Sequence, residues 1–582
     1  MRTRSFLLSV LVSALLIAAT ALAGLRQVEP QPVSQASLRF DAARAMALTG
    51  ELATRFPFRN DLHPDRERAA RWIRGQFREI GLEPRTQTFS EVIQSRKVEG
   101  LENIYVMLPG ASDEIVVVLA HYDIPLFVEQ GAADDASGVA VVLELARIFS
   151  QEKPGRTLLL MATDSEEYGA MWGTIQFLRQ FPQKEKIVAA LTLDFLNMGE
   201  QEGIMLRNMG LQRGYAPPWL RDLAMASIRP ETKPVESDTL FEWVERSVTI
   251  PPTEHGIFLA QGIPAVDLWG IPVDREAQAA LYHTANDKIE HLSEAAMANY
   301  GRAAERLVRS LAELDAIPQQ SGWYLGLAGG RYLAGWSVAL IQLWLFLPLI
   351  VAVARGWQER RRLAALSRAD LRERYGAVAK RLLGLWLPLL AGFALLKLLP
   401  EVGLMVKYEL YPATQKDPVL DNPQWLPVLL VVATVLLGLW VIGRESDWLR
   451  GPESGWEERR LGLLTALLGL ILVVWAFGAG FAAVSFLTLP AYLWLGIRPG
   501  ARWRSVLLWV LSTAIFVTFI LLFSLLYKIG VVWWYLLMGA SYGLFSVKAV
   551  LGFLVGLALH MEALSLAWGE AEAAPVRQRV AV

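Results

Sequence analysis

The sequence of 582 residues contains no cysteine. Disulfide bonds and thiolate metal ligands are therefore excluded, and any transition metal must be held by histidine and carboxylate side chains. Histidine is also scarce, with 6 residues in the whole chain, so the position of each one is informative. Net charge is lacking as well, because 56 Lys and Arg stand against 57 Asp and Glu. This balance gives no reason to expect a nucleic acid as partner.

Apolar residues are abundant instead, at 53% of the chain, and they include 21 Trp. Most of the excess follows Gly335, in the segments Trp336–Ala354, Leu382–Leu399, Trp425–Ile442, Leu461–Phe477, Phe481–Leu495, Ser505–Tyr527, Val531–Val547 and Val550–Trp568. Most of them approach the roughly 20 residues that a helix needs to span a bilayer. The few charges within them disfavour a large soluble helical core. The pattern predicts an all-α polytopic membrane domain of about 8 helices over residues 335–568, with the lipid bilayer as partner, and a polar tail at 569–582.

Residues 1–25 form a further apolar segment that begins with Arg2 and Arg4. A cleaved signal peptide and an uncleaved N-terminal membrane anchor both fit this pattern. In both cases the chain that follows is extracytoplasmic, in a periplasmic, extracellular or lumenal compartment. Residues 26–37 are polar and are expected to be a linker.

The charges of the later loops predict the same orientation. Arg355–Arg381 contains nine Lys or Arg and three acidic residues, and Arg498, Arg502 and Arg504 crowd a second loop. Loops rich in Lys and Arg remain in the cytoplasm. The loop after Leu399 is acidic and is expected on the opposite side. The side of the C-terminus stays open.

Residues 38–320, here called the α/β domain, precede a Gly-rich linker at 321–334. Apolar residues recur at helical spacing in Leu38–Leu82, and a final amphipathic helix is expected at Glu290–Leu314. Apolar runs predict strands at Arg85–Ile93, Asn103–Leu108, Ile115–Val118, Arg156–Thr163 and Ile187–Leu193, a buried helix at Ser137–Phe149, and a further strand that begins at Gly262. Alternating strands and helices predict a three-layer α/β fold with a mostly parallel central sheet.

Polar side chains follow these strands where each one ends: His121, Asp134, Glu166, Glu167 and Asp194, with His283 in a later loop. Ligand sites of such sheets lie just beyond the carboxyl ends of the strands. Two histidines with three carboxylates suit a pair of divalent ions, zinc above all. Taken singly, Asp134-Asp135 fits a turn or helix cap, Glu166-Glu167 fits solvated surface, and His283 fits a structural role. Their joint placement favours a metal site.

The order of these motifs carries a resemblance. His121-x-Asp123, Asp134 to Gly138 (Asp-Asp-Ala-Ser-Gly), Glu166-Glu167, Asp194 and His283-Thr284 resemble the co-catalytic zinc aminopeptidases of clan MH, the aminopeptidase Y and bacterial leucyl aminopeptidase family. The resemblance covers roughly Leu38–Leu314. A peptidase domain followed by several spans is similar to the membrane-anchored branch that includes endoplasmic-reticulum metallopeptidase and vacuolar membrane protease.

The resemblance implies two Zn²⁺ per chain and a peptide substrate that loses its N-terminal residue. One zinc would be held by His121 and Asp194, and the other by Glu167 and His283. Asp134 would bridge both, and Asp135 would follow it across a strained peptide bond that could be cis. Two catalytic residues complete the implied site. Glu166 would be the general base and no ligand, and Asp123 would accept the other ring N–H of His121.

Three other functions stay open. An inactive peptidase fold could serve as a binding or scaffold protein, and a glutaminyl cyclase shares the fold but uses one zinc. A transporter is the third, although the sequence supplies no substrate motif for it. Thr253-Glu254-His255 stands where the family tends to have Ser-Asp-His, so His255 is a candidate for contacting a ligand residue or the substrate. His560 and Glu562 lie in an apolar segment and are interpreted as packing or snorkelling residues.

Overall fold

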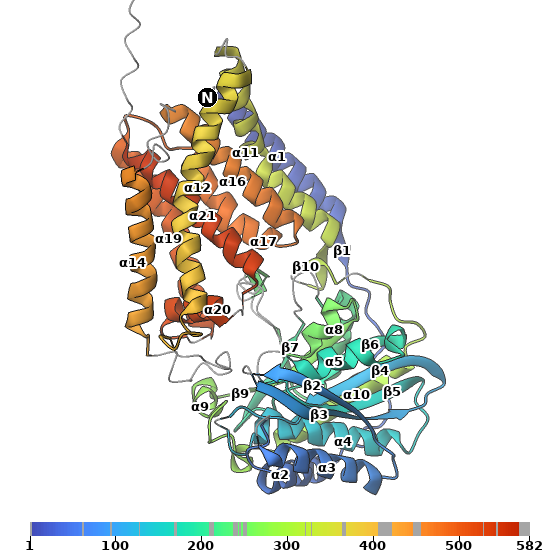
Figure 1. Cartoon of the computed structure of the whole chain (residues 1–582). Helices are drawn as coiled ribbons and strands as arrows, with labels where there is room; N and C mark the ends of the chain where they lie inside the picture. Colours follow the sequence, from blue (N-terminus) through green and yellow to red (C-terminus); the bar gives the residue numbers. More distant parts are fainter. Residues whose placement is uncertain are drawn as a thin grey trace, which may run out of the picture.

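The computed structural model describes residues 3–569 apart from 61–62, 94–95, 127, 168–170, 209–214, 237–241, 244–245, 248–252, 321, 328, 364–367, 406–421, 446–454, 528 and 543–544. In Figure 1 the α/β domain lies below a region of long helices. The two arise from different residue patterns, alternating short elements in the first and long apolar runs in the second.

An eight-stranded sheet forms the centre of the α/β domain. Its order is β2 (Arg85–Ile93), β3 (Arg96–Leu108), β5 (Arg156–Thr163), β4 (Ser112–His121), β6 (Ile187–Leu193), β9 (Ala265–Pro272), β7 (Gln201–Arg207) and β8 (Lys233–Val235). The central strands β5, β4, β6 and β9 run parallel, as do β7 and β8, whereas β2/β3, β3/β5 and β9/β7 are antiparallel. The α/β class with a mostly parallel centre is confirmed, and the antiparallel outer strands make the sheet mixed.

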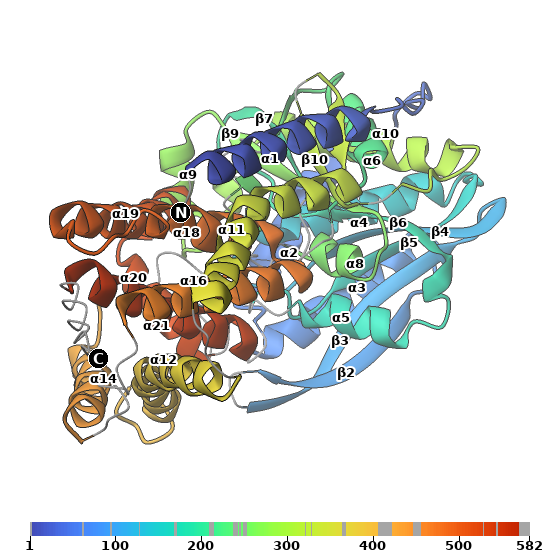
Figure 2. The ribbon, with the colours of Figure 1, turned by 90° about the horizontal axis from the view of Figure 1, so that it is seen from above.

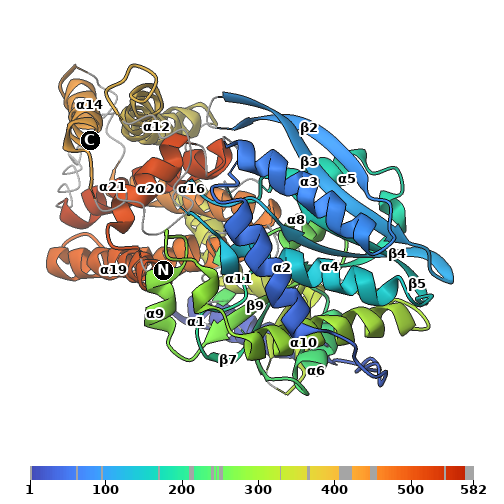
Figure 3. The ribbon, with the colours of Figure 1, turned by 90° about the horizontal axis from the view of Figure 1, so that it is seen from below.

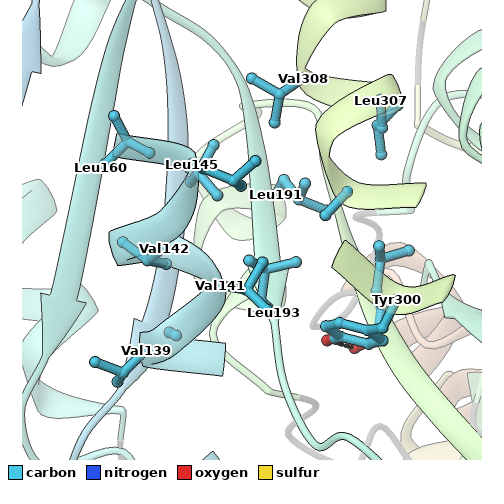
Figure 4. Packing of buried hydrophobic residues seen from close by; sticks show 14 of the residues in the cluster. Val139, Val141, Val142, Leu145, Leu160, Leu191, Leu193, Tyr300, Leu307 and Val308 are labelled. Atoms are coloured by element: carbon cyan, nitrogen blue, oxygen red, sulfur yellow. Dashed lines mark hydrogen bonds between the residues drawn. The ribbon is translucent and has the colours of Figure 1, made fainter. Parts of the chain in front are cut away.

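Helices cover both faces of this sheet. On one face lie α2 (Ala42–Arg55), α3 (Pro64–Glu79), α4 (Ser137–Phe149), α6 (Pro218–Ile228) and α10 (Glu294–Glu313); on the other lie α5 (Trp172–Gln180) and α8 (His255–Ala260). Successive residues of β4 alternate between the two: Val116 and Val118 pack with α4, and Val117 packs toward α5 and α8. Figure 4 shows α4, β6 and α10 meeting in the larger core. A strand buried on both faces reads as a continuous apolar run.

Some boundaries differ from the predicted ones. The helical stretch Leu38–Leu82 is two helices, because α2 starts after the cap of Asp41 and α3 starts at Pro64. The strands β7 and β8 and the helix α6 were not predicted. They are short, and their apolar residues form no long periodic run.

The helical region contains α11 (Gly335–Leu363), α12 (Arg368–Leu398), α14 (Trp425–Glu445), α16 (Trp456–Ala476), α17 (Gly480–Ala482), η4 (Ala483–Thr488), α18 (Leu489–Trp494), α19 (Arg502–Tyr527), α20 (Val532–Tyr542) and α21 (Val547–Trp568). Figures 2 and 3 show their packing from above and below. Together with α1 (Thr3–Gly24), 7 helices within the described residues are long and apolar enough to cross a membrane.

Two of the eight predicted apolar segments form shorter helices. Phe481–Leu495 lies in the stretch Gly480–Trp494, and Val531–Val547 contains the 11 residues of α20. At about 1.5 Å per residue, both are shorter than the roughly 30 Å hydrocarbon layer. The helical region therefore has six candidate spans among its described residues, where about eight were expected.

A small three-stranded sheet joins the two ends of the α/β domain. It consists of β1 (Leu25–Gln27), β11 (Arg331–Ala334) and β10 (Tyr324–Leu327), all antiparallel. The strand β1 follows α1 directly and β11 precedes α11, and these two helices pack side by side (Figure 1). The Oγ of Ser13 donates to the carbonyl of Trp344, whose Nε1 donates to Oγ1 of Thr20. Strands thus lie within both segments predicted as linkers.

Candidate metal centre

The predicted site residues meet at the carboxyl ends of the central strands. His121 ends β4, Glu166 and Glu167 follow β5, and Asp194 follows β6. Asp134 lies in the loop between β4 and α4, and His283 follows α9 (Arg275–Leu281). Each of the five predicted ligands is at least nine-tenths buried, and Glu166 is half-buried.

Asp134 lies between the two histidines. Its Oδ1 is 3.2 Å from Nε2 of His121, and its Oδ2 is 2.9 Å from Nε2 of His283. Each histidine also faces a second carboxylate: Oδ1 of Asp194 is 3.9 Å from His121, and Oε2 of Glu167 is 3.2 Å from His283. The structure therefore brings the five residues together as two groups that share Asp134.

These atoms fit a zinc site. At zinc–ligand distances of about 2.0–2.2 Å, two ligands of one tetrahedral ion lie roughly 3.3 Å apart. The separations around Asp134 bracket this value. Ligand atoms of His121, Asp134 and Glu167 also lie within 4.8 Å of one another. The buried Oε1 of Glu167 has no hydrogen-bond partner among the described residues, which leaves it available to a cation.

The titration properties follow from burial and close packing. Burial raises the pKa of Glu167 to about 7. Burial alone would also raise the pKa of Asp134, but the hydrogen bonds with His121 and His283 lower it overall. The carboxylates in turn raise the pKa of both histidines against the effect of burial. Without a metal ion, protons would therefore occupy the space between these ligands.

Asp123 contacts both the ring of His121 and the glutamate pair. Its carboxylate is 3.6 Å from Nδ1 of His121, which instead lies 3.2 Å from the backbone carbonyl of Asp123. The carboxylate accepts the backbone N–H groups of Glu166 at 3.0 Å and Glu167 at 3.1 Å. Asp123 therefore orients both glutamates, while its carbonyl orients the histidine ring.

Backbone strain is concentrated at the ligands. Ser165, Phe195 and His283 have φ values of 58°, 62° and 54°, the left-handed region that non-glycine residues rarely adopt. Ser165 precedes the glutamate pair, Phe195 follows Asp194, and His283 is itself a predicted ligand. Strained residues of this kind persist where the surrounding structure imposes them, and they cluster at functional sites. The Asp134–Asp135 peptide bond is cis, as the resemblance implied.

A buried arginine that was not predicted fixes the loop between His121 and Asp134. Arg59 is fully buried, and its Nε donates to the carbonyl of Tyr122 at 2.7 Å. Its Nη2 donates to the carbonyl of Gly131 at 2.7 Å, and its Nη1 to that of Gln130. Burial lowers the pKa of Arg59 to about 10, so it stays charged at neutral pH.

Asp287 was also missed, although it closely follows His283. Its carboxylate accepts the backbone N–H groups of Ala133 at 2.8 Å and Asp134 at 3.1 Å. Burial raises the pKa of Asp287 to about 7. Its position in the Tyr282–Asp287 motif was the available signal.

Glu254, the residue before the predicted candidate His255, interacts with the charges of the site. It is buried and accepts a hydrogen bond from Oγ1 of Thr174 at 2.6 Å, and its charge acts on Glu166. Burial raises the pKa of Glu254 to about 7. His255 is fully buried, with its Nδ1 2.9 Å from Oγ1 of Thr253. The structure therefore places His255 in a local contact within the Thr253–His255 motif.

Arg207 and a group of aromatic rings border the site on the side of β7 and β9. The guanidinium lies 3.5 Å from the ring centre of Trp269, and its Nη1 is 3.5 Å from Oδ2 of Asp194. The ring of Tyr282 stacks on His283 at 3.9 Å, and it meets Trp269 edge to face. Arg207 thus contacts Asp194, and Tyr282 contacts His283, on the side of β7 and β9.

Comparison with known proteins gives a match in this domain. Residues 103–308 match the family model described as Peptidase family M28. An aminopeptidase YwaD from Bacillus subtilis is 27% identical over 211 residues, 35% of this chain and 43% of that protein. A vacuolar membrane protease from Vanderwaltozyma polyspora is 24% identical over 260 residues, 43% of this chain and 25% of that protein. The chain thus spans less than half the length of these relatives.

Solved structures also resemble the chain. BSAP, a zinc aminopeptidase from Bacillus subtilis, is 14% identical with a TM-score of 0.41, covering 49% of this chain and 98% of that one. A glutaminyl cyclase from an Acidobacteriales bacterium is 20% identical with a TM-score of 0.39, covering 49% and 99%. The family match and the curated relatives confirm the predicted resemblance to zinc aminopeptidases and vacuolar membrane proteases.

Proposed function

We propose that this chain is a membrane-bound exopeptidase that holds two zinc ions and removes N-terminal residues from peptides. The observation that supports it most is the Asp134 carboxylate, whose two oxygens face different histidines, each with a second carboxylate of its own. One ion would be held by His121 and Asp194 and the other by Glu167 and His283, with Asp134 between them. The preference for a free N-terminus is carried over from the aminopeptidase relative.

The chain's own residues divide the chemical tasks. Zinc would supply Lewis acidity, which lowers the pKa of a water molecule and polarises the carbonyl of the scissile bond. Glu166 takes the proton of the attacking water and returns it to the leaving amine. Burial raises the pKa of Glu166 well above its ordinary value, which makes it a stronger proton acceptor. Glu167 differs in role because it lies within hydrogen-bonding distance of His283.

The membrane part of the proposal rests on length, hydropathy and charge. The candidate spans include α1, whose contacts with α11 would be lost on cleavage. This favours a retained anchor. The end of α11 and the start of α12, both rich in Lys and Arg, lie at the end of the helices away from the α/β domain (Figure 1). By the positive-inside rule, that end is cytoplasmic and the α/β domain is extracytoplasmic.

The test is metal content and activity of the purified full chain. It should carry about two zinc ions, because two ligand groups are present, and should cleave aminoacyl reporters but not N-blocked ones. His121→Ala and His283→Ala should each reduce the zinc content, since losing a ligand weakens chelation. His291→Ala, which changes a partly exposed histidine, is the matched control and should have no effect.

Other outcomes favour the alternatives. One tightly bound zinc, with activity on N-terminal glutamine that survives His121→Ala, would favour a glutaminyl cyclase. A protein that binds two zinc ions and hydrolyses no aminoacyl or dipeptide substrate would favour a scaffold.

A further inference from the structure

The α/β domain is attached to the helical region at two separate places, and the first is a short tether. The helix α1 ends at Gly24, and Ser34 is already fixed to α10: its N–H donates to Oγ of Ser310 and its Oγ donates to Glu313, both at 2.9 Å. Ten residues of extended chain reach at most about 36 Å. The pairing of Leu25 with Leu333 joins this tether to the start of α11.

The second attachment is a contact with the short helical stretch Gly480–Trp494. The Nε1 of Trp243 donates to Oγ of Ser485 at 2.9 Å, and Oγ of Ser247 lies 3.2 Å from the same atom. Arg246 is buried between two rings, 3.5 Å from the centre of Tyr215 and 5.4 Å from that of Phe481. Two attachments at different points restrict rotation of the domain as well as its distance from the helices.

The helix α9, which precedes His283, lies on the side of the α/β domain nearer to the helical region (Figure 1). In the same view α9 lies beneath α20. The helices α2 and α3 lie on the side of the domain farthest from the helical region (Figure 1).

From this arrangement we propose that the substrates are peptides attached to the bilayer, with a free N-terminus a short distance above the membrane surface. The inference rests on the proposed exopeptidase function and adds the substrate class. A membrane-attached N-terminus reaches a site that two attachments hold close to the helical region. A freely diffusing peptide gains nothing from that placement.

The experiment uses the full chain reconstituted in vesicles. One peptide sequence is offered free in solution, and also coupled through its carboxyl end to a lipid by flexible linkers of increasing length. The anchored peptide with a linker long enough to reach the site should be cleaved at least about tenfold faster than the free one, because attachment raises its effective concentration. The rate should then fall as the linker is lengthened further, because the effective concentration falls with linker length.

Trp243→Ala separates orientation from simple attachment. This variant removes the hydrogen bond to Ser485, so it should flatten the dependence on linker length while cleavage of the free peptide stays unchanged. Trp503→Ala changes a tryptophan that is 76% exposed, and it should keep the wild-type dependence. Equal rates at all linker lengths in the wild type, or a dependence that Trp243→Ala leaves intact, would overturn the inference. Failure to cleave any peptide would instead contradict the proposed function.

Discussion

Two clusters of buried charged side chains lie in different parts of the molecule, and they differ in the ratio of acidic to basic groups. At the end of the sheet, three carboxylates surround His121 and His283, and Glu254 and Asp287 lie close by. In the helical region, Glu562 of α21 is fully buried, and each of its oxygens accepts from an arginine. Nε of Arg381 donates at 2.7 Å and Nε of Arg459 at 2.8 Å.

The difference distinguishes a site from a structural contact. Ser565 accepts from both arginines as well, so the cluster around Glu562 ties α12, α16 and α21 together with its own side chains. The packing interpretation of Glu562 agrees with this, and snorkelling does not, because the carboxylate is paired within the protein. The cluster at the sheet has more buried acids than bases and needs protons or a cation from outside. A buried charge excess is therefore what marks the metal centre.

Replacing Glu166 by Gln should give the largest effect. The change keeps the size of the side chain and removes its ability to accept a proton, so kcat should fall by about 10²–10⁴-fold. Zinc content should remain at the wild-type level. Glu167→Gln is the comparison, and it should lose activity together with zinc, since Glu167 faces His283. Equal zinc loss in both variants would mean that the two roles are reversed.

Glu562→Gln should affect the other cluster alone. It leaves the partly exposed Arg381 and Arg459 without their anion, at a cost below the roughly 3–5 kcal/mol typical of a fully buried pair. We expect faster thermal inactivation in detergent, with zinc content and kcat of the folded fraction unchanged. Glu457→Gln, at an exposed position of α16, is the control and should cost less than about 0.5 kcal/mol. Loss of zinc in the Glu562 variant would show that the two clusters are coupled.

Arg59→Met tests whether the metal centre depends on a cation that contacts no predicted ligand. The variant leaves three buried carbonyl groups without their donor, at a cost on the order of 3 kcal/mol. Hydrogen exchange in the loop 122–131 should speed up, and zinc affinity should fall less than with a ligand substitution. Arg55→Met is the exposed neighbour and should leave both unchanged. Normal exchange in this loop would contradict the positioning role.

The smallest effect concerns pH in the zinc-free protein. Burial raises the pKa of Glu254 and Asp287 to about 7, from 4.5 and 3.8. The folded state keeps these protons where the unfolded chain has lost them, so their contribution is fully present below about pH 4 and is lost as the pH rises through 7. The raised pKa of His121 and His283 acts in the same direction at higher pH.

Hydrogen exchange in β4 and β6, corrected for intrinsic rates, measures this loss of stability. Exchange in the zinc-free protein should become faster between about pH 5 and 8, and zinc should weaken the trend, because it replaces the protons. The same dependence with and without zinc would mean that the carboxylates are neutralised in another way.

The sequence was sufficient for the elements that are buried on both faces. The strands Arg156–Thr163 and Ile187–Leu193 and the helix Ser137–Phe149 have the predicted bounds, since their apolar runs end where polar residues begin. The same rule pointed to the ligands, which follow the strands. The prediction of a membrane span from apolar runs failed for Phe481–Leu495, because hydropathy does not show where a helix breaks.

The supporting residues could not be found in this way. Arg59 meets Tyr122 across 63 residues, and Glu254 meets Thr174 across 80. Neither lies at a strand end, and a lone Arg or Glu is more often a surface residue than a buried one. Asp123 was named for its carboxylate, but the backbone of the glutamate turn determines where that carboxylate points. Such partners become visible only when the chain is folded.

The pairing of β1 with β11 has a consequence for how the chain is made. Leu25 and Leu333 are about 300 residues apart, so the sheet closes only after the whole α/β domain has been synthesised. In the membrane-bound arrangement proposed above, α1 would therefore pack against α11 only after the α/β domain between them has been made. The α/β domain would then be a long loop between two spans. Closure of the three strands is thus a late step, in which the first helix of the chain joins the rest.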